Sequence, residues 1–154
     1  MTAETGVEGT NVRIAFLMLI GFAVGCSGGG PGSTDTVSSS LPTLESRIEF
    51  LQRYVTFRRT YRELEFHIVF HDNSSGLPAP SEWDVRLIAC VPPEELTQWI
   101  PSGVQPLETA DTDWLTSVPR SEKAAGITEW YSEPHRVIGI DHKQSVVAYR
   151  SWKQ

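Results

Sequence analysis

The first part of the domain has apolar residues at the spacing of an α-helix. They recur three or four positions apart, at Leu44, Ile48, Leu51 and Val55. This spacing places them on one face of a helix, and Thr43 just before them has the side-chain oxygen of an N-cap. The pattern predicts a helix from about residue 43 to residue 59. Its four arginines are expected on the solvated side, with a phosphate site as the alternative: Arg47, Arg53, Arg58 and Arg59.

The period of the apolar residues then changes to two, which indicates strands. Four large apolar residues alternate with mostly polar neighbours, at Leu64, Phe66, Ile68 and Phe70. Such alternation is typical of a strand that is buried on one face only. Turn-forming residues fill positions 72–81, and residues 83–91 predict the hairpin partner of that strand. Residues 92–96 predict the start of a short helix, with proline and acidic residues in its first turn.

The remaining third of the chain predicts a long irregular loop and then three strands. Residues 101–126 contain three prolines and two glycines. Strand patterns follow at residues 127–132, 136–141 and 145–152, with a tight turn between the last two. The fold class predicted is therefore α+β. We expect an antiparallel sheet of about four to five strands, with one long N-terminal helix packed on a face and a short second helix.

An uncharged apolar run precedes this domain and ends at a cysteine. The run spans the twelve residues from Ile14 to Gly25, whereas a membrane-spanning helix needs about 20. Its length matches the apolar core of a signal peptide. Its end, Ala23-Val24-Gly25-Cys26, resembles the lipobox of bacterial lipoproteins, although that family usually has Leu where Ala23 stands. The alternatives are an ordinary signal peptide or a buried apolar helix.

The resemblance implies a chain that is exported and lipidated. Residues 1–25 would be a signal peptide that is removed, and Cys26 would carry lipid such as palmitate at a bacterial membrane. Ser27, in place of the Asp that retains some lipoproteins in the inner membrane, favours the outer membrane. Residues 1–11 hold two acidic residues and no basic one, although a signal peptide should begin with positive charge. We therefore expect translation to begin at Val12, with residues 1–11 a misassigned start.

A stretch rich in glycine and serine separates Cys26 from the predicted helix. Nine of the fourteen residues from 27 to 40 are Gly or Ser. Such a segment buries too little apolar area to offset the entropy of ordering, and its r.m.s. span is ~20 Å. The predicted organisation is thus a lipidated cysteine and disordered tether at 26–40, followed by a single α+β domain at 41–154.

The net charge disfavours two classes of binding partner, and the cysteine content disfavours a disulfide. The formal net charge of −6 disfavours nucleic acid, because phosphate binding needs a surplus of basic residues. It also disfavours electrostatic adhesion to anionic lipid. If Cys26 is lipidated, Cys90 is the only other cysteine and has no partner for a disulfide. Cys90 stands in an apolar run, which predicts a small buried residue rather than a nucleophile.

The sequence holds no motif for a metal, a cofactor or a catalytic nucleophile. His67 and His71 lie on one predicted strand, roughly 13 Å apart at ~3.3 Å per residue, too far for a single zinc ion with ~2 Å bonds. Asp141 and His142 occupy a predicted turn, while His135 stands at the opposite end of the same strand. We expect no metal, no cofactor and no catalytic residue that the sequence can name.

Trp114 and Leu115 are the candidate contacts for a partner. They lie in the long loop between acidic residues, and loops longer than about 12–15 residues are often functional. In the alternative, Trp114 folds back and covers an open end of the sheet. Five tryptophans in one small domain allow either role, because tryptophan packs in cores and also anchors partners.

The function predicted is that of an envelope lipoprotein whose exported domain is a binding or assembly module. Its partners would be the membrane, through lipid on Cys26, and an envelope protein or polymer. The alternative is a small cell-envelope hydrolase that acts on a wall polymer through scattered carboxylates or histidines. A cleft that brings titratable groups together would distinguish the two.

Overall fold

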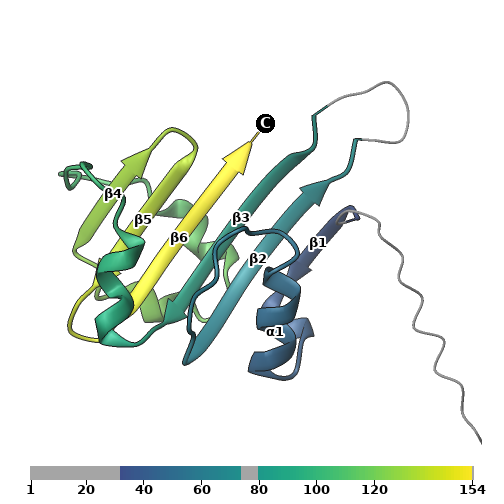
Figure 1. Ribbon diagram of the computed structural model, residues 1–154, viewed down its shortest axis with the longest axis horizontal. Coiled ribbons are helices and arrows are strands. Elements are labelled where there is room, and N and C mark those ends of the chain that lie inside the picture. Colours follow the sequence, from purple (N-terminus) through teal and green to yellow (C-terminus); the bar gives the residue numbers. More distant parts are fainter. Residues whose placement is uncertain (1–31, 74–79, 154) are drawn as a thin grey trace, which may run out of the picture.

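Six strands, each antiparallel to its neighbours, make up the centre of the protein (Figure 1). The computed structural model describes residues 32–73 and 80–153, so the predicted signal peptide and Cys26 lie outside the described residues. The strand order across the sheet is β1-β2-β3-β6-β5-β4. The strands are β1 (Thr34–Val37), β2 (Glu63–His71), β3 (Glu82–Cys90), β4 (Glu129–Glu133), β5 (Arg136–Asp141) and β6 (Val146–Lys153).

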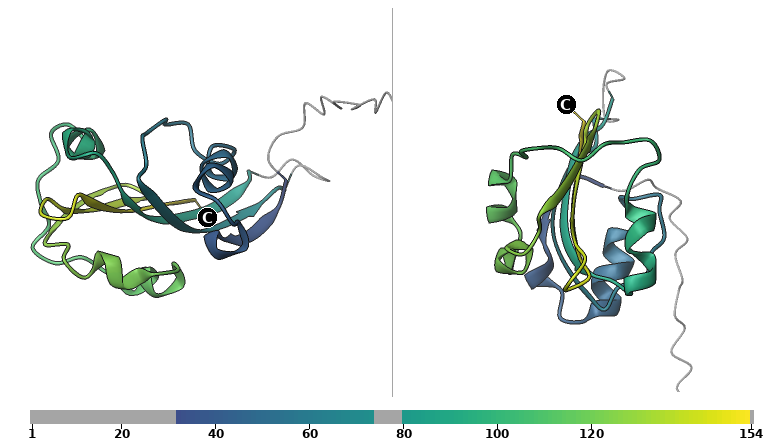
Figure 2. Two further views of the ribbon diagram at one scale, coloured as in Figure 1. Left: turned by 90° about the horizontal axis from the view of Figure 1, so that it is seen from below. Right: turned by 90° about the vertical axis from the view of Figure 1, so that its left-hand side faces the viewer.

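Helical segments cover both faces of this sheet. Figure 2 shows α1 and η2 on one side of the sheet, and η3 and η4 on the other. The α-helix is α1 (Leu44–Leu51), and the 3-10 helices are η1 (Ser38–Ser40), η2 (Pro93–Trp99), η3 (Asp113–Ser117) and η4 (Ser121–Ala124). Within the two described ranges, none of these helices is long and apolar enough to cross a membrane.

Alternation along the strands divides the core between the two faces. Leu64, Phe66 and Ile68 of β2 are fully buried on the face that α1 and η2 cover. On the opposite face, Ile88, Val146 and other small or branched residues form a second cluster under η3 and η4. The predicted α+β class, the antiparallel sheet and the two hairpins β2–β3 and β5–β6 are confirmed. The sheet has six strands rather than the expected four to five.

The extra strand β1 lies inside the segment that was predicted to be a disordered tether. Residues 34–37 read Thr-Asp-Thr-Val and pair with residues 67–70 of β2. Three of these four are β-branched, which favours extended backbone. The prediction of disorder is therefore wrong for residues 34–40, where the high glycine and serine content of the whole segment concealed a short edge strand.

The predicted long helix is also shorter than expected. Thr43 is its N-cap as predicted: its side chain accepts a hydrogen bond from the backbone N–H of Ser46. The helix ends at Leu51 rather than near residue 59. Aromatic and β-branched residues follow at 54–57, and these favour the helix less than the residues before them. Their rings pack elsewhere, with Tyr54 at 5.4 Å from Phe70 and Phe57 at 5.3 Å from Tyr149. The apolar stripe therefore belongs to the core, but only its first half is helical.

The loop at 101–126 folds back over the second face and onto an edge of the sheet. It contains the two short 3-10 helices η3 and η4. Pro106 forms an isolated bridge with Tyr131 of the edge strand β4. The loop ends at Gly126, where any Cβ would collide with the carboxylate of Asp141. The loop is thus part of the packed domain.

Candidate functional site

Trp114, one of the two predicted partner contacts, lies in the second core cluster. Its side chain is 6 % exposed, and it packs with Ile88 and Val146. Its Nε1 donates a hydrogen bond to the carbonyl of Asp111 at 3.1 Å. Leu115 is partly buried against the same cluster. This placement agrees with the alternative in which Trp114 covers the sheet.

The histidines that invited a metal hypothesis do stand on a strand. His67 and His71 belong to β2 and point to the same face, four residues apart. The Nε2 atom of His67 lies 2.8 Å from a carboxylate oxygen of Asp35 on β1. Among the described residues, no group of three or more His, Cys, Asp or Glu side chains is arranged to hold a metal ion. The expectation that the two histidines do not share a metal stays a prediction.

The other residues singled out in the sequence have ordinary structural surroundings. Asp141 accepts hydrogen bonds from the backbone N–H groups of Lys143 and Gln144, as expected in a turn. The ring of His135 packs edge-on against Trp152. Cys90 is half-buried rather than fully buried, and burial raises the pKa of its thiol. A raised pKa lowers the thiolate fraction, which agrees with the prediction that Cys90 is not a nucleophile.

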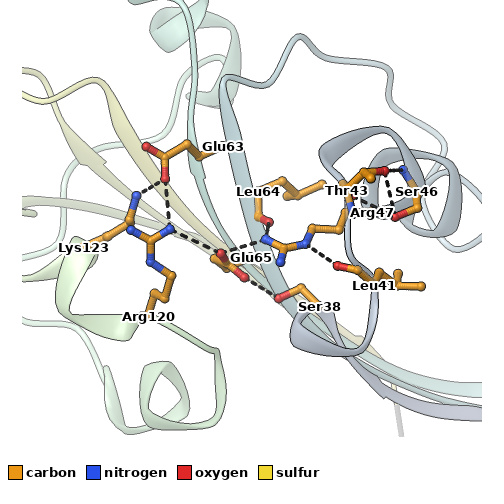
Figure 3. A network of polar contacts seen from close by, with 10 residues as sticks. All are labelled: Ser38, Leu41, Thr43, Ser46, Arg47, Glu63, Leu64, Glu65, Arg120 and Lys123. Carbon is orange, nitrogen blue, oxygen red and sulfur yellow. Dashed lines mark hydrogen bonds and ion pairs between the residues drawn. The ribbon is translucent and has the colours of Figure 1, made fainter.

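A buried carboxylate at Glu65 is the centre of a polar network that joins distant segments (Figure 3). Glu65 is 3 % exposed, although β2 was predicted to be solvated on this face. Its oxygens accept hydrogen bonds from the Ser38 hydroxyl at 2.6 Å and from Arg47 Nη1 at 2.8 Å. Arg120 lies 3.8 Å away from the same carboxylate. Arg47, expected on the solvated side of a helix, is thus turned inward.

The rest of this network pairs every charge with a partner. Arg47 also donates to the carbonyl of Leu64, which lies beyond the end of β1 and so lacks a strand partner there. Glu63 is paired with Lys123 and Arg120, as Figure 3 shows. The Lys123 hydrogen bond is the main cause of a lowered pKa for the Glu63 carboxyl. Because its donors and acceptors are occupied, the network is a structural tie rather than a ligand site.

A second polar cluster on the same face is centred on Asp84. Asp84 of β3 receives two hydrogen bonds from Arg150, at 3.1 and 2.9 Å, and one from Arg86 at 2.5 Å. Burial alone would raise the pKa of the Asp84 carboxyl, but the hydrogen bonds and charges of the two arginines outweigh it and lower that pKa. A hollow of about 240 Å³ adjoins this cluster. Two guanidinium groups here share one carboxylate, and Arg86 Nε is buried without an acceptor in the described part of the chain.

The opposite face of the sheet carries a groove with a different character. Two adjoining hollows, of about 230 and 210 Å³, lie there between the chain that follows α1 and the end of η2. The hollows share four lining residues: Thr56, Phe57, Arg136 and Tyr149. The first extends towards Trp83, and the second towards Trp99 and Arg59. We call these two connected hollows the aromatic groove.

Aromatic rings form much of the wall of the aromatic groove. Phe57 meets Tyr149 edge to face at a centroid distance of 5.3 Å, and it meets Trp99 in the same way at 5.4 Å. Trp99 is 6 % exposed and Tyr149 is 7 % exposed. Burial on this scale holds the rings in place, so the groove is largely preformed.

Unpaired hydrogen-bond donors line this wall. Within the described part of the chain, five buried side-chain nitrogens have no hydrogen-bond partner, and three of them are Arg59 Nε, Trp99 Nε1 and Arg136 Nε. The other two, His67 Nδ1 and Arg86 Nε, lie on the opposite face of the sheet. Arg59, Trp99 and Arg136 line the aromatic groove. A buried donor without a partner is rare and costs about 1–3 kcal/mol. Three of the five therefore belong to residues of one groove, whose hydrogen-bonding capacity the protein alone does not satisfy.

The two arginines of the groove are fixed in position. Arg59 donates to the side-chain and backbone oxygens of Gln98, at 3.2 and 2.9 Å. Its guanidinium also lies 5.7 Å from the ring centroid of Trp99. Arg136 is paired through Nη1 with Glu133 at 2.9 Å. These contacts leave Nε of each arginine unused and hold it in a defined place.

The residues that line this groove carry no sequence pattern that predicts a binding site. Phe57 and Arg59 were assigned to the long helix, and Arg59 to its solvated side, so the turn that brings them to η2 was missed. Trp99 and Arg136 carry no motif. The high number of tryptophans indicates that some of them could line a binding site. The sequence pattern does not indicate which ones do.

Comparison with known proteins adds no family to this description. No protein-family model, curated protein or solved structure matches the chain.

Proposed function

We propose that this protein is an envelope lipoprotein whose domain is a binding module, and that the aromatic groove is where it takes its ligand. The observation that carries the proposal is the set of three unpartnered donors at Arg59, Trp99 and Arg136 in one aromatic wall. A ligand with acceptor atoms at this place would satisfy donors that the protein alone leaves unpaired. The lipobox-like sequence around Cys26 supplies the anchor in this proposal.

Binding suits the groove better than hydrolysis. Among the described residues, the two hollows have no Asp, Glu, His or Cys in their lining. Hydrolysis of a wall polymer needs a general acid, a base or a nucleophile of that kind. Tyrosine and arginine side chains can orient a ligand, but arginine stays protonated and does not act as a proton donor or acceptor near neutral pH.

Fragment binding to the full chain tests this function. A set of small aromatic compounds, neutral, cationic and anionic, is titrated into the ¹⁵N-labelled protein, and the indole N–H signals are followed. We expect some of these compounds to shift the Trp99 signal, which a Trp99→Phe variant identifies. The Trp114 signal is the internal control, because its N–H already donates to Asp111. If no compound of any charge moves the Trp99 signal, the groove is not a binding site.

A further inference from the structure

We propose that the aromatic groove selects a small carboxylate with a flat apolar body. This inference rests on the proposed binding function and adds the chemical class of the ligand. The carboxylate would lie between Arg136 and Arg59, and the apolar part would lie against Phe57, Trp99 and Tyr149.

The charge of the lining points to an anion. Arg59 and Arg136 are the only charged residues among the described residues that line either hollow. The whole chain nevertheless has more acidic than basic residues, with a formal net charge of −6. A purely basic lining is therefore a local feature of the groove. Charges that face a partly buried site interact more strongly than charges in bulk water.

The free side of Arg136 points to a carboxylate. Glu133 takes its Nη1, and its Nε is buried without an acceptor in the described part of the chain, so a ligand would approach the edge formed by Nε and Nη2 from the Nη2 side. These two nitrogens form one edge of the planar guanidinium, which matches the two oxygens of a carboxylate. A phosphate can accept the same two hydrogen bonds, but it carries more negative charge than a carboxylate. Desolvation of that charge against an aromatic wall is more costly.

The size and shape of the groove limit the size and shape of the apolar part of the ligand. Each hollow holds about 230 or 210 Å³, below the roughly 300–1,000 Å³ of sites for drug-sized ligands. One or two fused rings therefore suit the groove better than a long chain or a polymer. The rings of Phe57, Trp99 and Tyr149 offer faces and edges against which a flat ligand packs.

Paired probes that differ in charge test the inference. Naphthalene-2-carboxylate and its neutral amide, naphthalene-2-carboxamide, are titrated separately into the full chain, with the Trp99 indole N–H signal as the readout. Naphthyl 2-phosphate is the third probe. The variants are Arg59→Gln and Arg136→Gln. Arg53→Gln is the matched control, because Arg53 is an exposed arginine outside the groove and is paired with Glu49.

We expect the carboxylate to bind at least about tenfold more tightly than the amide, as one charge-assisted interaction allows. Arg59→Gln and Arg136→Gln should each remove most of that preference, while Arg53→Gln stays within about twofold of the wild type. Equal binding of acid and amide, or tighter binding of the phosphate, would overturn the carboxylate inference and leave the binding function intact. If none of the three probes moves the Trp99 signal, the proposed function fails together with the inference.

Discussion

At the scale of single residues, Glu65 shows how much of this fold depends on one buried charge. It lies on a strand face that the sequence marks as polar, and yet the chain folds over it from two sides. Its partners Ser38, Arg47 and Arg120 come from η1, from α1 and from the turn before η4. The position of such a residue in a strand follows from the sequence, but its partners depend on chain reversals that local patterns do not encode.

Replacement of Glu65 should therefore destabilise the protein strongly. Glu65→Ala removes one partner of a buried pair and leaves Arg47, which is only 21 % exposed, without its carboxylate. We expect a loss of about 3 kcal/mol or more in the free energy of unfolding, measured by urea denaturation. Glu49→Ala is the control, because its pair with Arg53 is exposed and should contribute less than about 1 kcal/mol. Equal losses of stability in the two variants would show that the Glu65 network does not stabilise the fold more than an exposed ion pair does.

At the scale of elements, the predictions succeeded where one periodicity dominated and failed where packing decided. The strands β2, β3, β5 and β6 follow from alternation and from turn residues between them. The helix was extended too far because Tyr54 and Phe57 continue its apolar stripe, although their rings pack against Phe70 and Tyr149 from a non-helical chain. The strand β1 was missed because it has four residues, too few for a period to be recognised.

Asp84 of β3 pairs with Arg150 of β6, so it connects two central strands. Its contribution to the free energy of unfolding should depend on pH. Its folded-state pKa is lowered, because the hydrogen bonds from Arg86 and Arg150 outweigh its burial. A carboxyl with a lowered folded-state pKa adds stability above its unfolded pKa of about 3.9, and that stability is lost as the pH falls through the folded-state pKa.

Removal of this carboxylate should thus matter more at neutral pH than in acid. We expect Asp84→Asn to lower the free energy of unfolding by about 2 kcal/mol near pH 7, as for hydrogen bonds to charged groups. The difference from the wild type should shrink as the pH is lowered below about 4. Urea denaturation of both proteins across this pH range is the measurement. A difference that stays constant with pH would mean that ionisation of Asp84 does not stabilise the fold.

At the scale of the whole molecule, the sheet has a different role on each face. One face carries η3, η4 and the Glu65 network, and the other carries α1 and η2 (Figure 2). The aromatic groove lies on this second face, between the chain that follows α1 and the end of η2. The fold class was predictable because it depends on the order of elements. The groove was not, because its residues come from positions as far apart as Phe57, Trp99 and Arg136. Only the packed chain brings them together.

The proposed lipid anchor on Cys26 would determine where this groove acts, and it is the central claim about the protein as a whole. Intact-mass analysis of the chain, recovered from the membrane fraction of a bacterium that expresses it, tests that claim directly. The account predicts a mature protein that begins at Cys26 and carries a diacylated or triacylated cysteine. A Cys26→Ala protein should be neither lipidated nor held at the membrane. A membrane-bound chain that keeps residues 1–25, or a Cys26→Ala protein that is processed and retained as well as the wild type, would contradict the account.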